Sequence, residues 1–284
     1  MADDKLFELL APTRRTAVVN IGASDIGDPE LYQPLLDRDI GSLIGFEPLP
    51  EQFEILKAKQ LKNCTVLPYA IGDGAAHTLH VCAFWPMSSL LKPDPRQLQQ
   101  FIPFNDYGRV TGEIPVQTHR LDDVAEIQFM DFLKIDVQGF ELTVFQNGRN
   151  RLREAVALQV ELPFVKTYEN QPAFGEIDTE LQSLGFIPHF VTTAFVRMIA
   201  PMMPIAQGHG GLRQIHEVDM VYVRNFVQAD LMSDEQLKHL ALLAHHCFGS
   251  FDLALRCVFV LTERGTLPVG ARDQYLSLLK TLAK

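Results

Sequence analysis

The chain has 284 residues, of which 47% are hydrophobic and 21% are charged. This is the composition of a folded protein with a large apolar core, and no apolar run reaches the roughly 20 residues that span a membrane. The formal net charge of -10 opposes binding to a phosphate backbone, so a small molecule or a glycan is expected as partner rather than nucleic acid. Residues 1–5 lack the basic and apolar segments of a secretory signal, which predicts a cytoplasmic protein.

Short apolar runs rich in β-branched residues alternate with helix-like stretches, a rhythm typical of parallel βαβ units. Helices are expected to begin at Asp28-Pro29 and at Pro50, because proline is preformed for the first helical turn. Periodicity and composition together predict strands at residues 17–21, 42–46, 65–69, 132–135, 155–160 and 186–190. A further extended stretch, residues 220–223, counts as a seventh strand only on the family resemblance described below.

Two further extended stretches, residues 77–84 and 113–119, lie between the third and fourth strands. They predict an inserted β-hairpin with a long, proline-containing loop. From about Asp230 the pattern becomes helical: Ser233 opens a capping box with Gln236, and further helices are expected from Ser250 and near Arg272. We therefore expect an α/β domain over residues 1–228 and a helical C-terminal appendage over residues 229–284.

The first strand runs directly into a turn that contains Gly22 and Gly27. Glycine lets the backbone approach a nucleotide-type ligand closely, although a glycine at a strand end often only permits a tight turn. The second strand is followed by Glu47, whose carboxylate could accept both hydrogen bonds of a ribose diol. Such an acid serves NAD or S-adenosylmethionine equally, but the turn lacks the GxGxxG pattern that packs a pyrophosphate, which favours S-adenosylmethionine.

The fourth predicted strand is apolar until it delivers Asp136 to the carboxyl edge of the sheet. A lone aspartate there more often caps the following helix, but Asp136 shares this edge with Gly22 and Glu47, which favours a functional site. Glu161 is expected at the end of the fifth strand, close to Asp136. Two acids so placed could share a divalent metal or one proton.

Two histidines are further candidates for a general base. His209 lies among glycines, in a segment that we interpret as a loop able to cover an acceptor; an ordinary surface histidine is the commoner case. His216 lies close to the last predicted strand.

Together these motifs resemble the FkbM-type methyltransferases, whose marks are a DVGAN-like first turn, a FEP after the second strand and a LKIDVEGxE at the fourth. The chain carries all three in order, and the resemblance covers roughly residues 16–226. Three positions depart from the family pattern. Asn20 replaces a common Asp, Ser24 replaces Asn, and Gln138 replaces Glu, which removes a charge from the presumed reaction centre.

The resemblance implies a Rossmann-like class I methyltransferase fold, with a seven-stranded, mostly parallel sheet whose last strand is antiparallel. It implies S-adenosylmethionine as cofactor, with Glu47 at the ribose and Ile71 near the adenine. The first turn then supplies the remaining cofactor-binding candidates, of which the first three would line the methionine end: Gly22, Ala23, Ser24, Asp25 and Gly27. The candidate catalytic residues are Asp136, Glu161 and His209.

The resulting hypothesis is O-methyl transfer to a hydroxyl of a sugar, a glycan or glycolipid, or a polyketide-like acceptor. Methyl transfer mainly requires that nucleophile and donor are aligned, with a base to assist a hydroxyl. A dinucleotide-dependent oxidoreductase fits the same strand, glycine turn and distal acid. A non-catalytic glycan- or partner-binding protein that has kept the fold is a third possibility.

Overall fold

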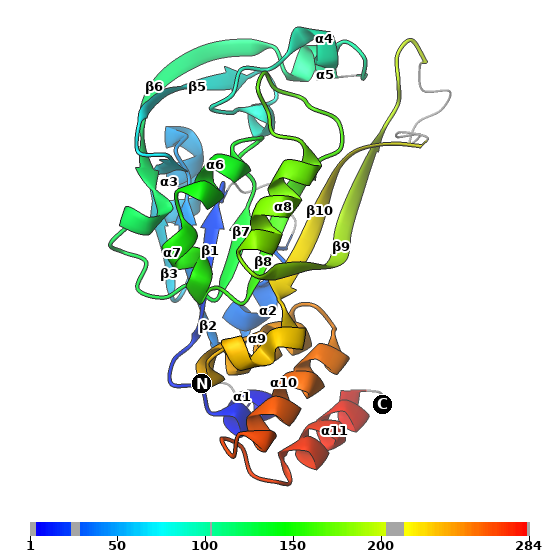
Figure 1. Ribbon diagram of the computed structural model, residues 1–284. Coiled ribbons are helices and arrows are strands. Elements are labelled where there is room, and N and C mark those ends of the chain that lie inside the picture. The colour runs from blue at the N-terminus through cyan, green and yellow to red at the C-terminus, as the bar shows by residue number, and fades with distance from the viewer. Residues whose placement is uncertain (1–3, 24–28, 103, 203–212, 283–284) are drawn as a thin grey trace.

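The computed structural model describes residues 4–23, 29–102, 104–202 and 213–282. Its main sheet has seven strands in the order β3-β2-β1-β7-β8-β10-β9 (Figure 1). Their bounds are β1 Thr16–Ile21, β2 Gly41–Phe46, β3 Cys64–Leu67, β7 Phe132–Ile135, β8 Ala157–Pro163, β9 Phe186–Arg197 and β10 Gln214–Arg224. The pairs from β3 to β8 are parallel, whereas β10 runs antiparallel to both β8 and β9. The predicted mostly parallel sheet with an antiparallel last strand is confirmed.

The two faces of the sheet bury different sets of helices. Val19 and Leu133 pack with α6 (Glu141–Gln146), α7 (Arg149–Glu154) and α8 (Phe174–Ser183). Val18 and Phe132, one position earlier on the same strands, pack on the opposite face. Because successive strand residues point to opposite faces, a strand covered on both sides is a near-continuous apolar run. This explains why the central strands could be predicted from composition.

The prediction of a long helix from Asp28-Pro29 is wrong. The helix between β1 and β2 is α2, which spans only Gln33–Asp37, and Pro29 and Glu30 lie outside any helix. A helix starting at Pro29 would place Pro34 in its interior, where proline offers no amide hydrogen and clashes with the preceding turn. The helix predicted from Pro50 is present as α3 (Pro50–Ala58).

The inserted hairpin is present, and its second strand is longer than predicted. Strands β5 (Ala76–Cys82) and β6 (Val110–Arg120) pair antiparallel, and β4 (Ala70–Gly72) joins β6 in parallel. The connection between β5 and β6 carries η1 (Trp85–Met87), α4 (Pro95–Leu98) and α5 (Phe104–Tyr107), and η2 (Leu121–Asp123) follows β6. Figure 1 shows this insertion beyond the carboxyl ends of the central strands. An isolated bridge between Phe101 and Ile199 ties it to the segment after β9.

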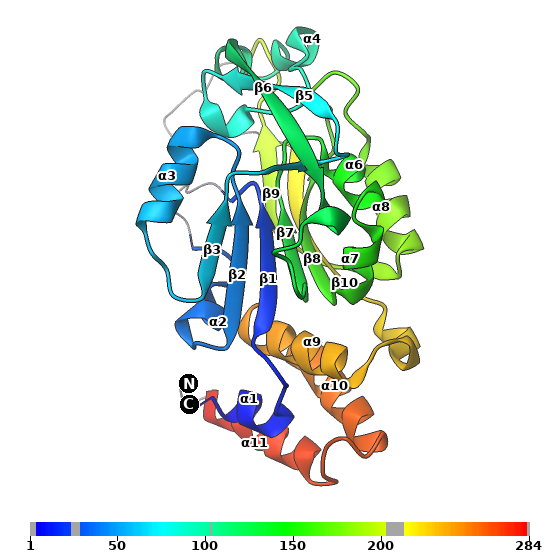
Figure 2. The ribbon, with the colours of Figure 1, turned by 90° about the vertical axis from the view of Figure 1, so that its left-hand side faces the viewer.

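The C-terminal residues form helices at the opposite end of the molecule (Figure 2). After η3 (Phe226–Leu231) come α9 (Asp234–His246), α10 (Phe251–Glu263) and α11 (Ala271–Leu282), and α1 (Lys5–Leu10) lies against them. Ser233 accepts a hydrogen bond from the Gln236 amide, so the predicted capping box is formed. Leu240 and Val258 are fully buried in the same cluster as Val18 of β1. Within the described residues, the model contains no helix long and apolar enough to cross a membrane.

Candidate active site at the carboxyl edge of the sheet

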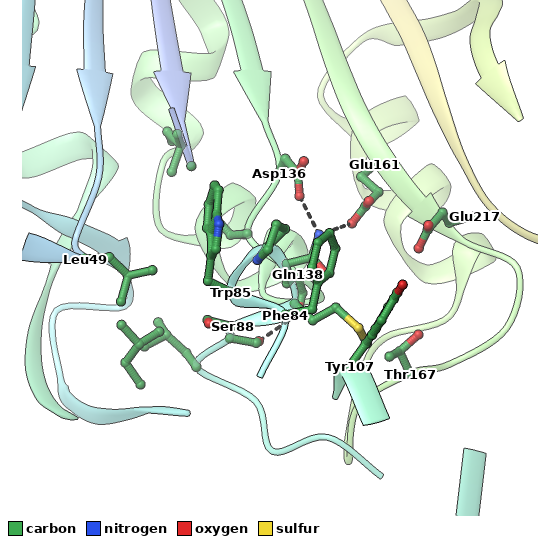
Figure 3. A pocket seen from close by; sticks show the side chains of 18 of the residues that line it. Leu49, Phe84, Trp85, Ser88, Tyr107, Asp136, Gln138, Glu161, Thr167 and Glu217 are labelled. Atoms are coloured by element: carbon green, nitrogen blue, oxygen red, sulfur yellow. Dashed lines mark hydrogen bonds between the residues drawn. The ribbon is translucent and has the colours of Figure 1, made fainter. Parts of the chain in front are cut away.

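A cavity of about 740 Å³ lies over the carboxyl ends of β1, β2, β7 and β8. This is within the usual range of roughly 300 to 1,000 Å³ for small-molecule sites. The insertion and the outer part of β9 supply its other walls. In Figure 3, Leu49 lies at one side of the cavity and Tyr107 at the other, with Asp136 and Gln138 between them. We refer to these two sides as the Glu47 end and the Tyr107 end.

The Glu47 end is formed by the tips of neighbouring strands. The Glu47 side chain is only 3% exposed, and its Oε1 accepts a hydrogen bond from the Leu49 amide at 2.7 Å. Burial raises the pKa of Glu47 to about 7, although the Leu49 amide acts in the opposite direction. The walls beside it are the apolar side chains of Phe46 and Ile71. The site therefore holds a buried carboxylate with spare capacity to accept hydrogen bonds.

Gly22 joins this end to the tip of β7. The amides of Gly22 and Ala23 both donate to the Phe46 carbonyl oxygen at 3.1 Å, which fixes the turn against β2. Gly22 has a φ of +81°, and a side chain there would overlap the backbone carbonyl oxygen of Asp136. Glycine is therefore required both by the conformation and by the close approach of the two strand ends.

Between the two ends, one amide links two carboxylates (Figure 3). Gln138 Nε2 donates to Asp136 Oδ1 at 2.8 Å and to Glu161 Oε2 at 3.0 Å. Burial and then the charge of Asp136 raise the pKa of Glu161 well above its usual value. Lys134 Nζ lies 3.5 Å from Asp136 Oδ2. Burial lowers the pKa of Lys134, but neighbouring carboxylates, Asp136 first, raise it by more.

Aromatic side chains dominate the Tyr107 end. The rings of Phe84 and Tyr107 lie 4.9 Å apart, and their side chains are 45% and 40% exposed. Trp85 of η1 also lines the cavity, and in Figure 3 it lies between Leu49 and Gln138. Opposite the Phe84 and Tyr107 rings, Arg197 Nη2 lies 3.2 Å from Glu217 Oε1. This end thus offers exposed rings beside a charge pair that is already neutralised.

Acidic groups outnumber basic ones around the cavity. Both lining cations found among the described residues, Lys134 and Arg197, are paired with lining carboxylates. The lining carboxylates are those of Glu30, Glu47, Asp136, Glu161 and Glu217. In the described parts of the chain, no cluster of three or more His, Cys, Asp or Glu side chains is arranged to hold a metal ion.

Residues 20–188, more than half of the chain, match the family model of the methyltransferase FkbM domain. The chain belongs to the FkbM methyltransferase family. It is 25% identical over 192 residues to the 2-O-methyltransferase NoeI of Sinorhizobium fredii (strain NBRC 101917 / NGR234), covering 61% of this chain and 74% of that protein. The predicted family is confirmed, and the activity class is S-adenosylmethionine-dependent methyl transfer.

Solved methyltransferase structures are similar at low identity. The precorrin-6y C5,15-methyltransferase of Geobacter metallireducens GS-15 has a TM-score of 0.38 and 11% identity, over 77% of this chain and 85% of that one. The 23S rRNA methyltransferase ErmE has a TM-score of 0.35 and 11% identity, over the full length of both chains. Independently of these structures, the FkbM family match and the strand order β3-β2-β1-β7-β8-β10-β9 show the predicted Rossmann-like class I methyltransferase fold.

The cavity of this FkbM-family protein brings together five of the residues singled out from its sequence, namely Gly22, Glu47, Ile71, Asp136 and Glu161. Ala23 lies apart from them, packed against β2 at Gly45 and beside a second cavity of about 220 Å³. Four other candidates, Ser24, Asp25, Gly27 and His209, lie outside the described residues.

His216 lies behind the Tyr107 end. It is 1% exposed, and its ring packs edge-on against Phe101 and Phe104 at 5.0 and 4.9 Å. Its Nε2 is 3.3 Å from Thr167 Oγ1 and its Nδ1 is 3.3 Å from Glu217 Oε2. His216 therefore supports two cavity-lining side chains, and it is not among the described residues that line the cavity.

Sequence reasoning missed several side chains that line the cavity. Trp85, Tyr107 and Arg197 follow no motif and sit on segments far apart in the chain. The role of Gln138 as a bridge was also missed, although its departure from the family motif was visible. The available signal was the local sequence: Gln138 lies two residues after Asp136 at the tip of β7 and directly before a glycine.

The residues at the Glu47 end fit the adenosyl part of S-adenosylmethionine. The buried Glu47 carboxylate is a suitable acceptor for two ribose hydroxyls, and Phe46 and Ile71 provide apolar surface for a base. Gly22 lines the cavity with backbone alone, which lets a ligand approach the main chain closely. No phosphate-binding glycine pattern is needed, because this cofactor has no phosphate.

Proposed function

We propose that this protein transfers the methyl group of S-adenosylmethionine to a hydroxyl of a sugar or sugar-like acceptor. The observation that carries the proposal is a single cavity that joins the Glu47 end, the Asp136 and Glu161 carboxylates and the aromatic Tyr107 end. An enzyme for transfer between two ligands needs both of them held in line at one reaction centre. In this cavity the Glu47 end is followed by the Asp136 and Glu161 carboxylates and then by the Tyr107 end (Figure 3).

Glu47 would hold the cofactor by accepting hydrogen bonds from its ribose, with Gly22 beside the methionine portion and Ile71 near the adenine. The bound cofactor supplies an electrophilic methyl group on a positively charged sulfur. Asp136 lies next along the cavity, and its amide donates a hydrogen bond to the carbonyl oxygen of Ile21, directly before the Gly22 turn. The carboxylates of the reaction centre favour the positive charge of the sulfonium in the ground state.

Asp136 and Glu161 would orient the acceptor hydroxyl, and one of the two would take its proton as the new carbon–oxygen bond forms and the bond between the methyl carbon and sulfur breaks. A base assists because a hydroxyl is a weak nucleophile while it keeps its proton. Burial and the neighbouring Asp136 charge raise the pKa of Glu161, which makes its carboxylate a better proton acceptor than an exposed glutamate. Lys134 Nζ lies near the Asp136 carboxylate. Asp136 therefore has a cation beside it, and its surroundings differ from those of Glu161.

The Tyr107 end would bind the ring of the acceptor. Exposed aromatic faces suit the apolar face of a pyranose. Among the described lining residues both cations, Lys134 and Arg197, are paired with carboxylates, which makes them weak attractors of a phosphate. The lining carboxylates together with the net charge of -10 oppose nucleic acid and other polyanions. This favours neutral acceptors over nucleotide sugars, uronic acids and RNA.

The named relative is a 2-O-methyltransferase, which supports oxygen as the methylated atom. The FkbM family match favours methyl transfer over the oxidoreductase alternative. A role for a divalent metal is tested by adding a chelator to the assay described below. Only a measurement of methyl-transfer activity can decide between this enzyme and a non-catalytic binding protein with the same fold.

The test is a methyl-transfer assay with isotope-labelled S-adenosylmethionine over neutral hexosides, deoxyhexosides, glycolipids, uronic acids and ribosomal RNA. We expect label on a hydroxyl of a neutral sugar. Loss of labelling in the presence of a chelator, with recovery on addition of Mg²⁺, would assign a divalent metal to the reaction. Label found only in RNA, or on a nitrogen atom, would refute the proposed acceptor. Binding of an acceptor without any transfer would support the non-catalytic alternative.

A further inference from the structure

Gln138 connects β7 to α6 in a backbone conformation that residues with side chains rarely adopt. Its φ is +54° and that of Gly139 is +99°, and glutamine is not among the side chains that enter this region readily. The turn is held on both sides. Glu141 Oε1 accepts from the amides of Val137 and Gly139 at 3.0 and 3.2 Å, and Ser89 Oγ donates to the Gln138 carbonyl oxygen at 2.7 Å.

The side chain of Gln138 uses both its donors and its acceptor. Nε2 donates to Asp136 Oδ1 and Glu161 Oε2, as described above. Oε1 lies 2.7 Å from the hydroxyl of Tyr168, which is itself only 3% exposed. A primary amide has two hydrogens on nitrogen and an oxygen acceptor, so each finds a partner here. Figure 3 shows the side chain between the two carboxylates.

The surroundings of this amide are rich in negative charge. Two carboxylates that both approach one nitrogen repel each other when ionised, and an uncharged double donor attracts both without adding a third negative charge. Glutamate at this position, as in the related family motif, would add that charge and remove both donors. The titratable groups around the pair are Glu30, Lys134, Glu141, Tyr168, Glu217 and Asp219.

We propose that Gln138 is a positioning residue for methyl transfer, whose amide holds the Asp136 and Glu161 carboxylates side by side towards the acceptor hydroxyl. The inference rests on the proposed function, because it assumes a hydroxyl acceptor at this pair. The amide engages one oxygen of each carboxylate. The second oxygens, Asp136 Oδ2 near Lys134 and Glu161 Oε1, are left to contact the acceptor. Gln138 itself moves no proton.

The first test is Gln138→Glu, which keeps the size of the side chain and exchanges its double donor for an acceptor. We expect kcat to fall about 100-fold near pH 8, with the dissociation constant of S-adenosylhomocysteine within about threefold of the wild type. The loss should shrink as the pH is lowered towards about 6, because a protonated carboxyl regains one O–H donor. A pH-independent loss would overturn the positioning role.

The matched control is Gln60→Glu, the same exchange at an exposed glutamine that also has a positive φ, of +46°. It should keep wild-type kcat at every pH. A second variant, Gln138→Gly, keeps the turn because glycine adopts positive φ freely, and it deletes only the amide. We expect an unchanged melting temperature and a kcat reduced about tenfold. Parallel losses of melting temperature and kcat would instead indicate a purely structural role.

A spectroscopic readout separates this inference from the proposed function. If the wild type methylates nothing in the acceptor panel, the proposed function fails. The contact of the Gln138 amide with the two carboxylates, here called the clamp, can still be tested by carbon-13 NMR titration of the Glu161 carboxyl. Its signal is assigned by its loss in Glu161→Gln. Removing a donor from a carboxylate raises its pKa, so the Glu161 midpoint should rise in Gln138→Gly. An unchanged midpoint would overturn the clamp.

Discussion

The two ends of the cavity are built in different ways. At the Glu47 end, backbone hydrogen bonds between adjacent strand tips hold a buried carboxylate and a glycine turn. At the Tyr107 end, exposed aromatic rings and the paired Arg197 come from the insertion and from β9. The Glu47 end, built from strand tips, suits a ligand that is always the same. The side chains of the Tyr107 end can be substituted without disturbing the sheet. Cofactor binding and acceptor choice should therefore be separable by mutation.

The largest effect should come from removing the support that both ends share. Truncation after Gln228 deletes α9 to α11, whose buried leucines pack with Val18 and Phe132 of the central strands. We expect insoluble or strongly destabilised protein, because that apolar surface would face water. Solubility and thermal unfolding measure this. A truncated protein with the melting temperature of the full chain would instead make residues 229–284 a detachable module.

A milder probe of the same contact is Leu240→Ala. Leu240 is fully buried, and such a truncation typically costs about 2 to 5 kcal/mol of unfolding free energy. Leu255→Ala, at a half-buried position on α10, is the matched control and should cost less.

Next in size is Asp136→Asn, at the junction of the two ends. The exchange preserves shape and deletes the charge, so kcat should drop by about 100-fold or more while affinity for S-adenosylhomocysteine changes little. Asp230→Asn, at an exposed aspartate of η3, is the control. Full activity of Asp136→Asn on an accepted substrate would remove this carboxylate from the reaction.

Glu47→Ala should affect one end alone. We expect S-adenosylhomocysteine binding to weaken by about 1 to 3 kcal/mol, with kcat at saturating cofactor nearly unchanged. Glu54→Ala, on the exposed side of α3, should bind normally. Calorimetry that gives equal dissociation constants for Glu47→Ala and the wild type would place the ribose elsewhere.

The pH dependence of binding sharpens the assignment of Glu47. Burial raises the pKa of this carboxyl to about 7, so it is protonated below and ionised above that pH. The ionised form is the stronger acceptor for ribose hydroxyls. Affinity should therefore increase as pH rises through about 7, and this increase should disappear in Glu47→Ala. The same rise in both proteins would point to another titrating group.

The smallest effect is expected from Tyr107→Ala. Aromatic packing of this kind is worth roughly 0.5 to 1.5 kcal/mol, so the KM for the acceptor should rise about 2- to 10-fold without a change in cofactor affinity. Phe129→Ala, at an exposed ring away from the cavity, is the control. An altered cofactor affinity in Tyr107→Ala would contradict the separation of the two ends.

The difference between the ends also explains what the sequence could predict. Gly22, Glu47 and Asp136 each follow a buried strand directly, so strand prediction alone brings them to one edge. Trp85, Tyr107 and Arg197 line one cavity only because the insertion folds back over the sheet, and nothing local to those residues encodes that arrangement. An isolated bridge such as that between Phe101 and Ile199 joins segments almost a hundred residues apart.

The fold shows the same limit. β1, β2 and β7 were predicted because both of their faces are buried, but the outer halves of β9 and β10 were missed. The outer half of β9 consists of half-buried and exposed residues, and that of β10 mixes the polar His216, Glu217 and Asp219 with apolar residues, so their apolar signal is weak. The length of α2 was wrong because Pro34 outweighed the start signal at Asp28-Pro29.

A crystal structure with bound S-adenosylhomocysteine tests the central claim most directly. The account predicts ribose hydroxyls within hydrogen-bond distance of the Glu47 carboxylate, an adenine beside Ile71, and the sulfur facing Asp136 and Glu161. The Tyr107 end should stay free for the acceptor. An adenosyl group bound against Tyr107, or outside the cavity, would contradict the account.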